Sequence, residues 1–342
     1  MAMYCVSDIL PQNILKHTSY SIRSARTTTM PETIKSVKIP GIAWDIAADI
    51  YFPPSFDETK KHAAVVSAHP IGSCKEQTSG NVYGKAMAEA GFVVVAFDAS
   101  FQGASGGLPR FVENPELRVS DFRYVVDYIQ TLPYVDAERL GVLGICGGGA
   151  YAFNATMTDY RLKCCVGITA ANFGRLVRES FGGFDPVGSL EKMAKQRTLE
   201  AQGADRYVFP FLPPTVEEAK KMTSDPDIIE ATEYYKTSRG QKPCGATSGL
   251  FSFNSAAVAW DAFNYAEVIM TRPFIAVIGD IPGGFGAYRD GHEIYGRAAS
   301  KEKELVVLPG VSHYQLYDEP KAVKAALEKV LPFLKKHLGE AK

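Results

Sequence analysis

The sequence predicts an α/β protein whose open, mostly parallel, twisted sheet is covered by helices on both faces and carries a mostly helical cap insertion. Short, nearly continuous apolar runs recur along the chain, as expected of parallel strands buried on both faces. Amphipathic stretches with helical periodicity separate most of these runs, which predicts right-handed crossovers. The apolar runs lie at residues 63–68, 92–97, 140–144, 165–170, 273–279 and 304–310.

Other elements can be assigned from local patterns in chain order. Residues 33–53 alternate or run apolar on either side of Pro40-Gly41, which is typical of an opening β-hairpin. One helical face is expected from Leu117, Phe122, Val125, Ile129 and Leu132. A last helix is expected from Val323, Leu327, Val330, Leu334 and Leu338, with a kink at Pro332.

The spacing of these elements divides the chain into an extension, a core and a cap. Residues 30–171 and 265–342 carry the strand and helix alternation, so we expect them to form the core. Residues 172–264 are too many for one crossover helix and contain three helical stretches and an aromatic tract. We expect a mostly helical cap, whose aromatic side chains either line an acyl or alkyl pocket or anchor the cap to the core.

The charge balance excludes several kinds of partner. The formal net charge is −1, which gives no electrostatic reason to expect nucleic acid or an anionic membrane surface as a partner. No run of eighteen apolar residues occurs, so we expect no membrane span. A small-molecule substrate is the expected partner, and a homodimer is compatible with the sequence.

The cysteines and the N-terminal residues bear on cofactors and localisation. The six cysteines show neither C-x-x-C pairs nor zinc-ligand spacing, so we expect reduced thiols, no metal and no cofactor. Residues 1–29 are rich in Ser and Thr, with Lys16, Arg23 and Arg26 against one acid, Asp8. This profile permits a mitochondrial transit peptide, but we favour a disordered extension and a cytoplasmic protein.

The sharpest motif is the run Gly144-Ile145-Cys146-Gly147-Gly148, which lies between an apolar strand and a helix. It is the cysteine form of the nucleophile elbow G-x-S-x-G. Glycines let the backbone turn sharply, and the helix N-terminus after the turn favours a thiolate. Cys146 is therefore the candidate nucleophile, and Gly147 a candidate oxyanion N–H donor. The alternative is a small buried residue at a glycine-rich turn.

The remaining candidates follow from their positions after other strands. His313 comes directly after the last apolar run, where this architecture places its base. The loop after 63–68 is expected to supply a second oxyanion N–H from Ile71, because Pro70 has none. His69 either shapes that loop by hydrogen bonding or is only a turn residue. The triad acid is expected at Asp280, with two alternatives further along the chain, Asp290 and Glu293.

From about Met30 onward, these motifs together resemble the α/β-hydrolase superfamily. Cys146 at the elbow is similar to that of the dienelactone hydrolases. The HPIGS loop, the GICGGG elbow and the long cap resemble the group of fungal polyketide transferases and thiohydrolases. The resemblance implies cleavage or transfer of acyl groups from esters, lactones or polyketide thioesters. Asp280 lies earlier than the usual acid, and no carboxylate near His69 matches the one that dienelactone hydrolases keep beside their cysteine.

Three hypotheses follow from the sequence. In the first, Cys146, His313 and Asp280 form a triad that passes an ester or thioester acyl group through a thioacyl-enzyme. In the second, the chain is a non-catalytic small-molecule-binding protein on the same scaffold. In the third, it is a redox-responsive protein in which Cys146 forms a disulfide, with Cys74 as the nearest candidate by motif placement.

Overall fold

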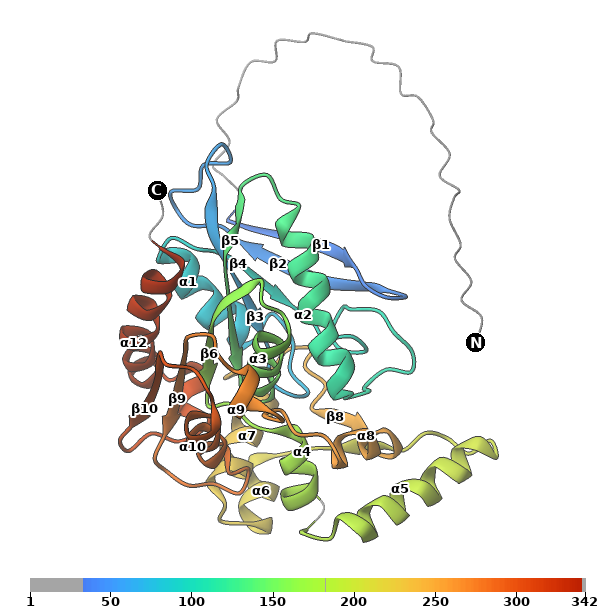
Figure 1. The fold of residues 1–342 in the computed structure, drawn as a ribbon. Coiled ribbons are helices and arrows are strands. Elements are labelled where there is room, and N and C mark those ends of the chain that lie inside the picture. Colours follow the sequence, from blue (N-terminus) through green and yellow to red (C-terminus); the bar gives the residue numbers. More distant parts are fainter. Residues whose placement is uncertain (1–32, 182, 340–342) are drawn as a thin grey trace, which may run out of the picture. The chain divides into compact units, whose positions relative to one another are not determined.

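The structure is a computed structural model that describes residues 33–181 and 183–339. The predicted extension over 1–29 lies outside the described residues. Eight strands of the described chain form one sheet in the order β1-β2-β4-β3-β5-β6-β9-β10 (Figure 1). Only the pairings β1–β2 and β2–β4 are antiparallel, so the predicted mostly parallel sheet is confirmed. The strands are β1 Ile34–Pro40, β2 Asp45–Tyr51, β3 His62–Ala68, β4 Val93–Phe97, β5 Val135–Ile145, β6 Leu162–Ile168, β9 Phe274–Gly279 and β10 Lys303–Leu308.

Each apolar run assigned from the sequence coincides with one of the parallel strands. β3 and β4 are buried at every position, which explains why they read as continuous rather than alternating apolar runs. The predicted opening hairpin is β1 and β2, paired antiparallel from Ile34–Tyr51 to Pro40–Asp45. The predicted early helix is α2, Pro115–Gln130, whose Asn114 side chain accepts from the Leu117 N–H and caps its first turn.

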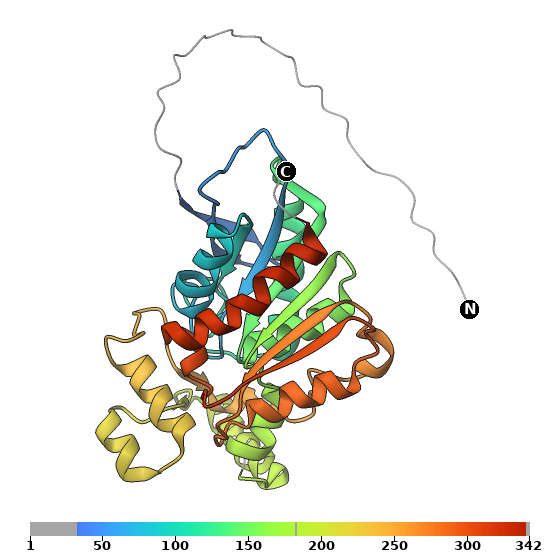
Figure 2. The same ribbon diagram turned by 90° about the vertical axis from the view of Figure 1, so that its left-hand side faces the viewer.

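Helices cover both faces of the sheet, and strand β6 shows which face each helix takes. A Cβ on Gly141 of β5 would lie beside Cys164 and Leu334, so Cys164 points toward α12, Pro320–Leu338. The next residue, Cys165, bonds to Thr156, and Gly167 faces the Phe153 ring, so both point toward α3, Gly147–Thr158. Because successive residues of a strand point to opposite faces, α3 and α12 sandwich the sheet. Figure 2 shows α12 lying across one face.

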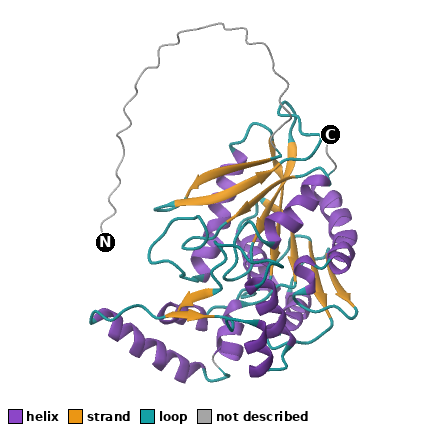
Figure 3. Ribbon diagram, turned by 180° about the vertical axis from the view of Figure 1, so that it is seen from behind, coloured by secondary structure: helices purple, strands orange, loops and turns teal. Residues whose placement is uncertain are grey.

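The segment after β6 contains the helices predicted for the insertion. The three expected helical stretches are α5 Pro186–Ala201, α6 Val216–Met222 and α7 Pro226–Lys236, and each begins at a capping Asp or Thr. Two short strands, β7 Val208–Pro210 and β8 Ser248–Leu250, pair with each other apart from the main sheet (Figure 3). The remaining helical turns here are α4 Phe173–Leu176, η2 Val177–Phe181, η3 Phe251–Asn254, α8 Ser255–Val258 and α9 Ala266–Ile269.

The remaining core helices complete the layers. They are η1 Thr78–Gly84, α1 Lys85–Glu89, α10 Ala287–Arg297 and α11 Gln315–Asp318. Side-chain hydrogen bonds join η1 to α11, since the Tyr83 hydroxyl donates to the Leu316 carbonyl and the Thr78 hydroxyl to the Tyr317 carbonyl. These two contacts position α11 at the carboxyl ends of the strands, where α/β sheets carry their sites. None of the helices that the structure describes has the length and apolar character needed to cross a bilayer.

Candidate active site

Cys146 occupies a strained backbone conformation between β5 and α3. Its φ of 52° and ψ of −124° are sparsely populated for a residue with a side chain. The turn is possible because glycines flank it: a Cβ on Gly148 would lie 2.5 Å from the His69 carbonyl oxygen, and one on Gly144 would lie 2.2 Å from the Gly148 oxygen. The predicted strand–turn–helix context of the elbow is therefore present.

The thiol of Cys146 lies in a buried site with two hydrogen-bonding groups. The residue is 6 % exposed, and its sulfur bonds to the Tyr317 side chain and to the Gly147 backbone. Burial raises the pKa of the Cys146 thiol to about 11, although both hydrogen bonds favour the thiolate. At neutral pH the resting group is consequently a protonated thiol, which needs a base to become a nucleophile.

His313 meets this thiol through Tyr317. Its Nε2 lies 3.3 Å from the Tyr317 hydroxyl, and its Nδ1 lies 2.8 Å from the Thr169 hydroxyl. Burial lowers the pKa of His313 to about 3, so the resting imidazole is neutral and one of its ring nitrogens can accept a hydrogen bond. These contacts thus connect Cys146, Tyr317 and His313 in series. Tyr317 was missed in the sequence; it lies in α11, Gln315–Asp318, which follows the turn that holds His313.

The three acids considered for the triad occupy other positions. Asp280 is exposed, and its Oδ1 accepts from the Gly310 N–H at 2.6 Å. Glu293 pairs with Arg297 on the solvent side of α10 at 2.7 Å. The group that contacts Nδ1 of His313 is the Thr169 hydroxyl and not Asp280. Asp280, directly after β9, instead accepts from the Gly310 N–H in the loop after β10. The geometry therefore does not bring Asp280 to His313 as expected.

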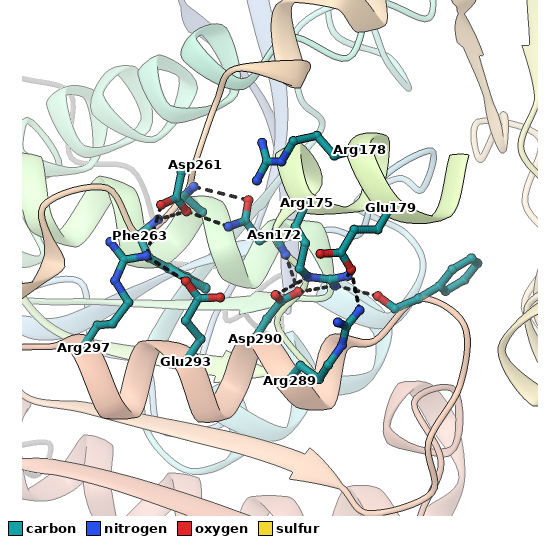
Figure 4. Close-up of polar contacts among 12 residues, drawn as sticks. Asn172, Arg175, Arg178, Glu179, Asp261, Phe263, Arg289, Asp290, Glu293 and Arg297 are labelled. Atoms are coloured by element: carbon teal, nitrogen blue, oxygen red, sulfur yellow. Dashed lines mark hydrogen bonds and ion pairs between the residues drawn. The ribbon is translucent and has the colours of Figure 1, made fainter. Parts of the chain in front are cut away.

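Asp290 is buried but belongs to a structural network. Its carboxylate accepts two hydrogen bonds from the Arg175 guanidinium, at 2.5 and 2.6 Å, and one from the Asn172 N–H at 2.8 Å. Figure 4 shows Asp290 reaching from α10 to Arg175 on α4, with Glu179 and Arg289 beside them. This network joins the beginning of the insertion to the core, and both carboxylate oxygens of Asp290 accept hydrogen bonds within it.

A different carboxyl, Asp227, lines the same small cavity as His313. It stands in the first turn of α7, is 3 % exposed, and accepts from the Phe285 N–H at 2.8 Å. Thr169 also lines this cavity. Burial raises the pKa of Asp227 to about 7. Sequence reasoning missed it because the insertion, not the strand β9, supplies the residue.

The loop after β3, which was expected to supply a second oxyanion N–H, packs against the elbow. Ile71 contacts the elbow, since a Cβ on Gly147 would lie 2.4 Å from Ile71 Cγ1. His69 is fully buried: its Nδ1 donates to the Pro70 carbonyl at 2.6 Å, and its Nε2 accepts from the Ala99 N–H at 3.0 Å. Arg118 also donates to the His69 carbonyl at 2.9 Å. His69 therefore shapes the loop by hydrogen bonding, which was one of its two expected roles.

An apolar pocket ends at the Cys146 sulfur. Both the core and the insertion contribute its walls, and side chains with an ionised group are absent among the described lining residues. The lining residues are Ile71, Cys146, Leu176, Phe211, Leu212, Tyr235, Thr247, Phe285, Tyr314 and Tyr317. Phe211 of the aromatic tract lines this pocket, whereas Tyr207, Phe209 and Phe251 pack on one another. Phe251 and Trp260 also pack against the hydrophobic core, so one expected role, lining a pocket, falls to Phe211 and the other, anchoring to the core, to Phe251 and Trp260.

One group of possible metal ligands lies outside this pocket. Within the described residues, only Cys74, Glu76 and Cys244 bring three ligand atoms of this kind within 4.8 Å of one another. The sequence showed no zinc-ligand spacing because these residues come from two segments that the fold brings together.

The pKa values of the site predict how Cys146 reacts with an alkylating reagent. With a thiol pKa of about 11 and a neutral His313, the thiolate fraction should rise about tenfold per pH unit. We expect the iodoacetamide rate at Cys146, followed by peptide mass spectrometry, to keep rising between about pH 7 and pH 9. A rate that levels off below neutral pH would instead indicate a preformed thiolate–imidazolium pair.

The network of Figure 4 predicts unequal roles for two aspartates. Asp290→Asn leaves the buried Arg175 guanidinium without its bidentate partner, so the free energy of unfolding should fall by about 3 kcal/mol. Asp280→Asn is the matched control, and it should change stability by less than about 1 kcal/mol because residue 280 is exposed. Urea unfolding at neutral pH measures both, and equal losses would contradict the assignment.

Comparisons with known proteins identify the family of the chain. Residues 59–320 match the family described as serine aminopeptidase, S33. The chain is 36 % identical over 297 residues to YcjY of Escherichia coli strain K12, a match that covers 86 % of this chain and 94 % of YcjY. It is 34 % identical over 74 residues to a thiohydrolase of Eupenicillium brefeldianum, covering 22 % of this chain and 24 % of that protein.

A solved structure extends the comparison to three dimensions. The crystal structure of PA2218 from Pseudomonas aeruginosa superposes with a TM-score of 0.78 at 28 % identity. The superposition covers 93 % of this chain and all of the other chain. The chain therefore belongs to the serine aminopeptidase S33 family and has the α/β-hydrolase fold.

Proposed function

We propose that this α/β hydrolase cleaves or transfers acyl groups of small esters or thioesters through a thioacyl-enzyme on Cys146. The observation that carries the proposal is the series of contacts from the Cys146 sulfur through the Tyr317 hydroxyl to Nε2 of His313. Cys146 and Tyr317 line an apolar pocket, and the backbone of Cys146 has a conformation that is costly for any residue other than glycine. Strain of this kind persists where the surrounding structure requires it, as at catalytic elbows.

Proton transfer would run along the same contacts. As the sulfur attacks the acyl carbonyl, the thiol proton passes to the Tyr317 oxygen while the Tyr317 proton passes to Nε2 of His313. A tautomer with the proton on Nδ1 fits both contacts of the imidazole, since Nδ1–H can then donate to Thr169. The imidazolium later returns the proton to the leaving alcohol or thiol, and then activates water or an acceptor.

Backbone N–H groups would stabilise the oxyanion. Gly147 already bonds to the Cys146 sulfur, and Ile71 lies against Gly147 across the pocket. A donor of this kind contributes about 3 kcal/mol to transition-state stabilisation. The fixed position of the Ile71 loop, held by His69 and Arg118, favours this role because a preorganised donor needs no rearrangement during the reaction.

Asp227 is a better candidate than Asp280 for the acid of the predicted triad. It lines the cavity beside His313, and with a pKa of about 7 it ionises in the neutral range. A carboxylate there would stabilise the imidazolium that forms when His313 accepts the proton. Asp280 has its oxygen on the Gly310 N–H and is exposed to solvent.

The lining of the pocket indicates an uncharged acyl group. Aromatic and aliphatic side chains form most of the pocket wall, which also includes the hydroxyl-bearing side chain of Thr247. The partial match to a thiohydrolase favours a thioester as the acyl donor. A specific observation keeps a binding-only protein as the second candidate: Cys146 is 6 % exposed and its burial raises the thiol pKa to about 11.

The first test is acyl transfer to the nucleophile. Incubation with short and medium acyl thioesters of N-acetylcysteamine should give an acyl adduct on Cys146, and Cys146→Ala or His313→Ala should reduce turnover by at least about 10³-fold. Cys165→Ala, a buried cysteine of the neighbouring strand, is the matched control and should retain activity. Full turnover by the Cys146→Ala variant, or binding without turnover by the unmodified chain, would overturn the catalytic proposal.

The second test concerns the relay. Tyr317→Phe removes the hydroxyl and keeps the ring, so kcat should fall about 10²-fold with little change in KM. Tyr234→Phe is the matched control, because its ring packs 5.1 Å from that of Tyr317 but does not line the pocket. Unchanged kcat in Tyr317→Phe alongside an inactive Cys146→Ala would show that His313 deprotonates the thiol directly.

A further inference from the structure

Two cysteines outside the pocket lie in direct contact. Cys74 follows β3 in the oxyanion loop, residues 69–77, and Cys244 lies in residues 240–247 of the insertion, which we term the cap strap. Their sulfurs are 2.8 Å apart although the residues are 170 positions apart in the chain. Cys74 is fully buried and Cys244 is half-buried, so the pair has one inner and one accessible thiol.

The backbone around the pair is held by contacts that do not involve sulfur. The Gln77 side chain donates to the Gly240 carbonyl at 2.6 Å and accepts from the Cys74 N–H at 3.1 Å. The Thr247 N–H donates to the Gly72 carbonyl at 2.9 Å. The oxyanion loop and the cap strap are thus fastened on both sides of the two thiols. A bonded S–S distance is about 2.05 Å, so bond formation needs a movement of less than about 1 Å.

The same cluster is less suited to a metal ion. Two thiolates on one tetrahedral zinc, each about 2.3 Å from it, would stand roughly 3.8 Å apart, which is farther than the observed 2.8 Å. The third ligand, Glu76, is paired with the Lys75 ammonium, which also bonds to Asp49 at 2.7 Å. A cation at the cluster would meet this ammonium at close range.

We propose that Cys74 and Cys244 form a reversible disulfide that links the cap strap to the oxyanion loop, with a low-molecular-weight disulfide such as oxidised glutathione as the oxidant. Cys244, the accessible thiol, attacks the oxidant, forms a mixed disulfide and releases one thiol. Cys74 then attacks Cys244 of the mixed disulfide and releases the second thiol. The two protein thiols are oxidised, one small disulfide is reduced to two thiols, and the two protons remain on those thiols.

The bond would act on the wall of the candidate active site. Thr247 of the cap strap and Ile71 of the oxyanion loop both line the pocket that ends at Cys146. The proposal replaces the sequence-based pairing of Cys74 with Cys146, because the contact of Cys74 is Cys244 and the sulfur of Cys146 bonds to Tyr317. It does not depend on the proposed acyl chemistry.

Burial and charge around the two thiols indicate how fast the disulfide between Cys74 and Cys244 should form. Burial raises the pKa of the Cys244 thiol, and the neighbouring Glu76 and Asp98 carboxylates act in the same direction. Burial also raises the pKa of Cys74, and the Lys75 ammonium next to it in the chain is paired with Glu76 and Asp49. Since the thiolate is the attacking species, oxidation should be slow at neutral pH and faster in mild alkali.

The experiment treats the full-length protein with excess oxidised glutathione at about pH 8.5 and compares it with Cys244→Ser and Cys146→Ser. Non-reducing peptide mass spectrometry should find a peptide pair joined through Cys74 and Cys244 in the unmodified chain and in Cys146→Ser. Cys244→Ser should give none. The midpoint of thermal unfolding should rise by roughly 5 °C on oxidation and return after reduction, because the bond closes a long loop.

Four outcomes would overturn the proposal. Both thiols could remain free to alkylation, or a mixed disulfide could persist on Cys244 without resolution by Cys74. Stoichiometric zinc, found by elemental analysis and lost in Cys244→Ser without any cross-link, would assign the cluster to a metal instead. A cross-link between any other pair of cysteines, with Cys74 and Cys244 still reduced, counts equally against it.

Discussion

The site depends on the left-handed backbone of one residue with a side chain. Cys146 takes a φ of 52° because the strand β5 must end and α3 must begin within a single residue. That geometry requires the α3 backbone to approach β3 closely, and only glycine at 148 fits beside the Ala68 and His69 carbonyls. The same approach brings Gly147 against Ile71. One backbone constraint therefore places the sulfur, both candidate oxyanion donors and the end of the pocket.

Buried polar contacts hold the loops around this turn. Arg118 pairs with Glu113 at 3.1 Å and donates to His69, and Asp98 accepts from the Lys75 and Ala104 N–H groups at 2.7 and 2.8 Å. Buried charges are tolerated where each has partners, and here those partners are the backbone of the oxyanion loop and its neighbour. The loop is consequently positioned by the core rather than by a ligand.

Residues 172–264 contribute side chains to the candidate site. Arg175 and Asp290 join α4 to α10, while Asp227 of α7 reaches the cavity beside His313. Phe211, Tyr235 and Thr247 supply the pocket wall opposite the elbow. Because Asp227 and part of the pocket wall come from residues 172–264, the packing of this segment on the core determines the shape of the pocket. The thiol pair of the cap strap lies on this same junction.

The strands, the layers of helices on both faces and the position of the elbow could be predicted from the sequence. Those features follow from the local periodicity of apolar residues and from glycines that act on a few neighbouring residues. The strand, turn and helix around Cys146 are an example. The acid was not determined in this way. Asp280 was expected from its place after β9, yet its oxygen accepts from the Gly310 N–H. The carboxyl that shares a small cavity with His313 is Asp227, from a segment about 50 residues before Asp280.

The partners of these side chains depend on contacts between segments that are distant in the chain. A side chain after a strand can bond to the nearest turn or reach a distant residue, and both choices have the same local pattern. The Tyr317 hydroxyl between the thiol and the imidazole, and the contact of Cys74 with Cys244, arise where separate segments meet. Hydrogen bonds and thiol contacts act over about 3 Å, so they depend on packing that no periodicity along the chain records.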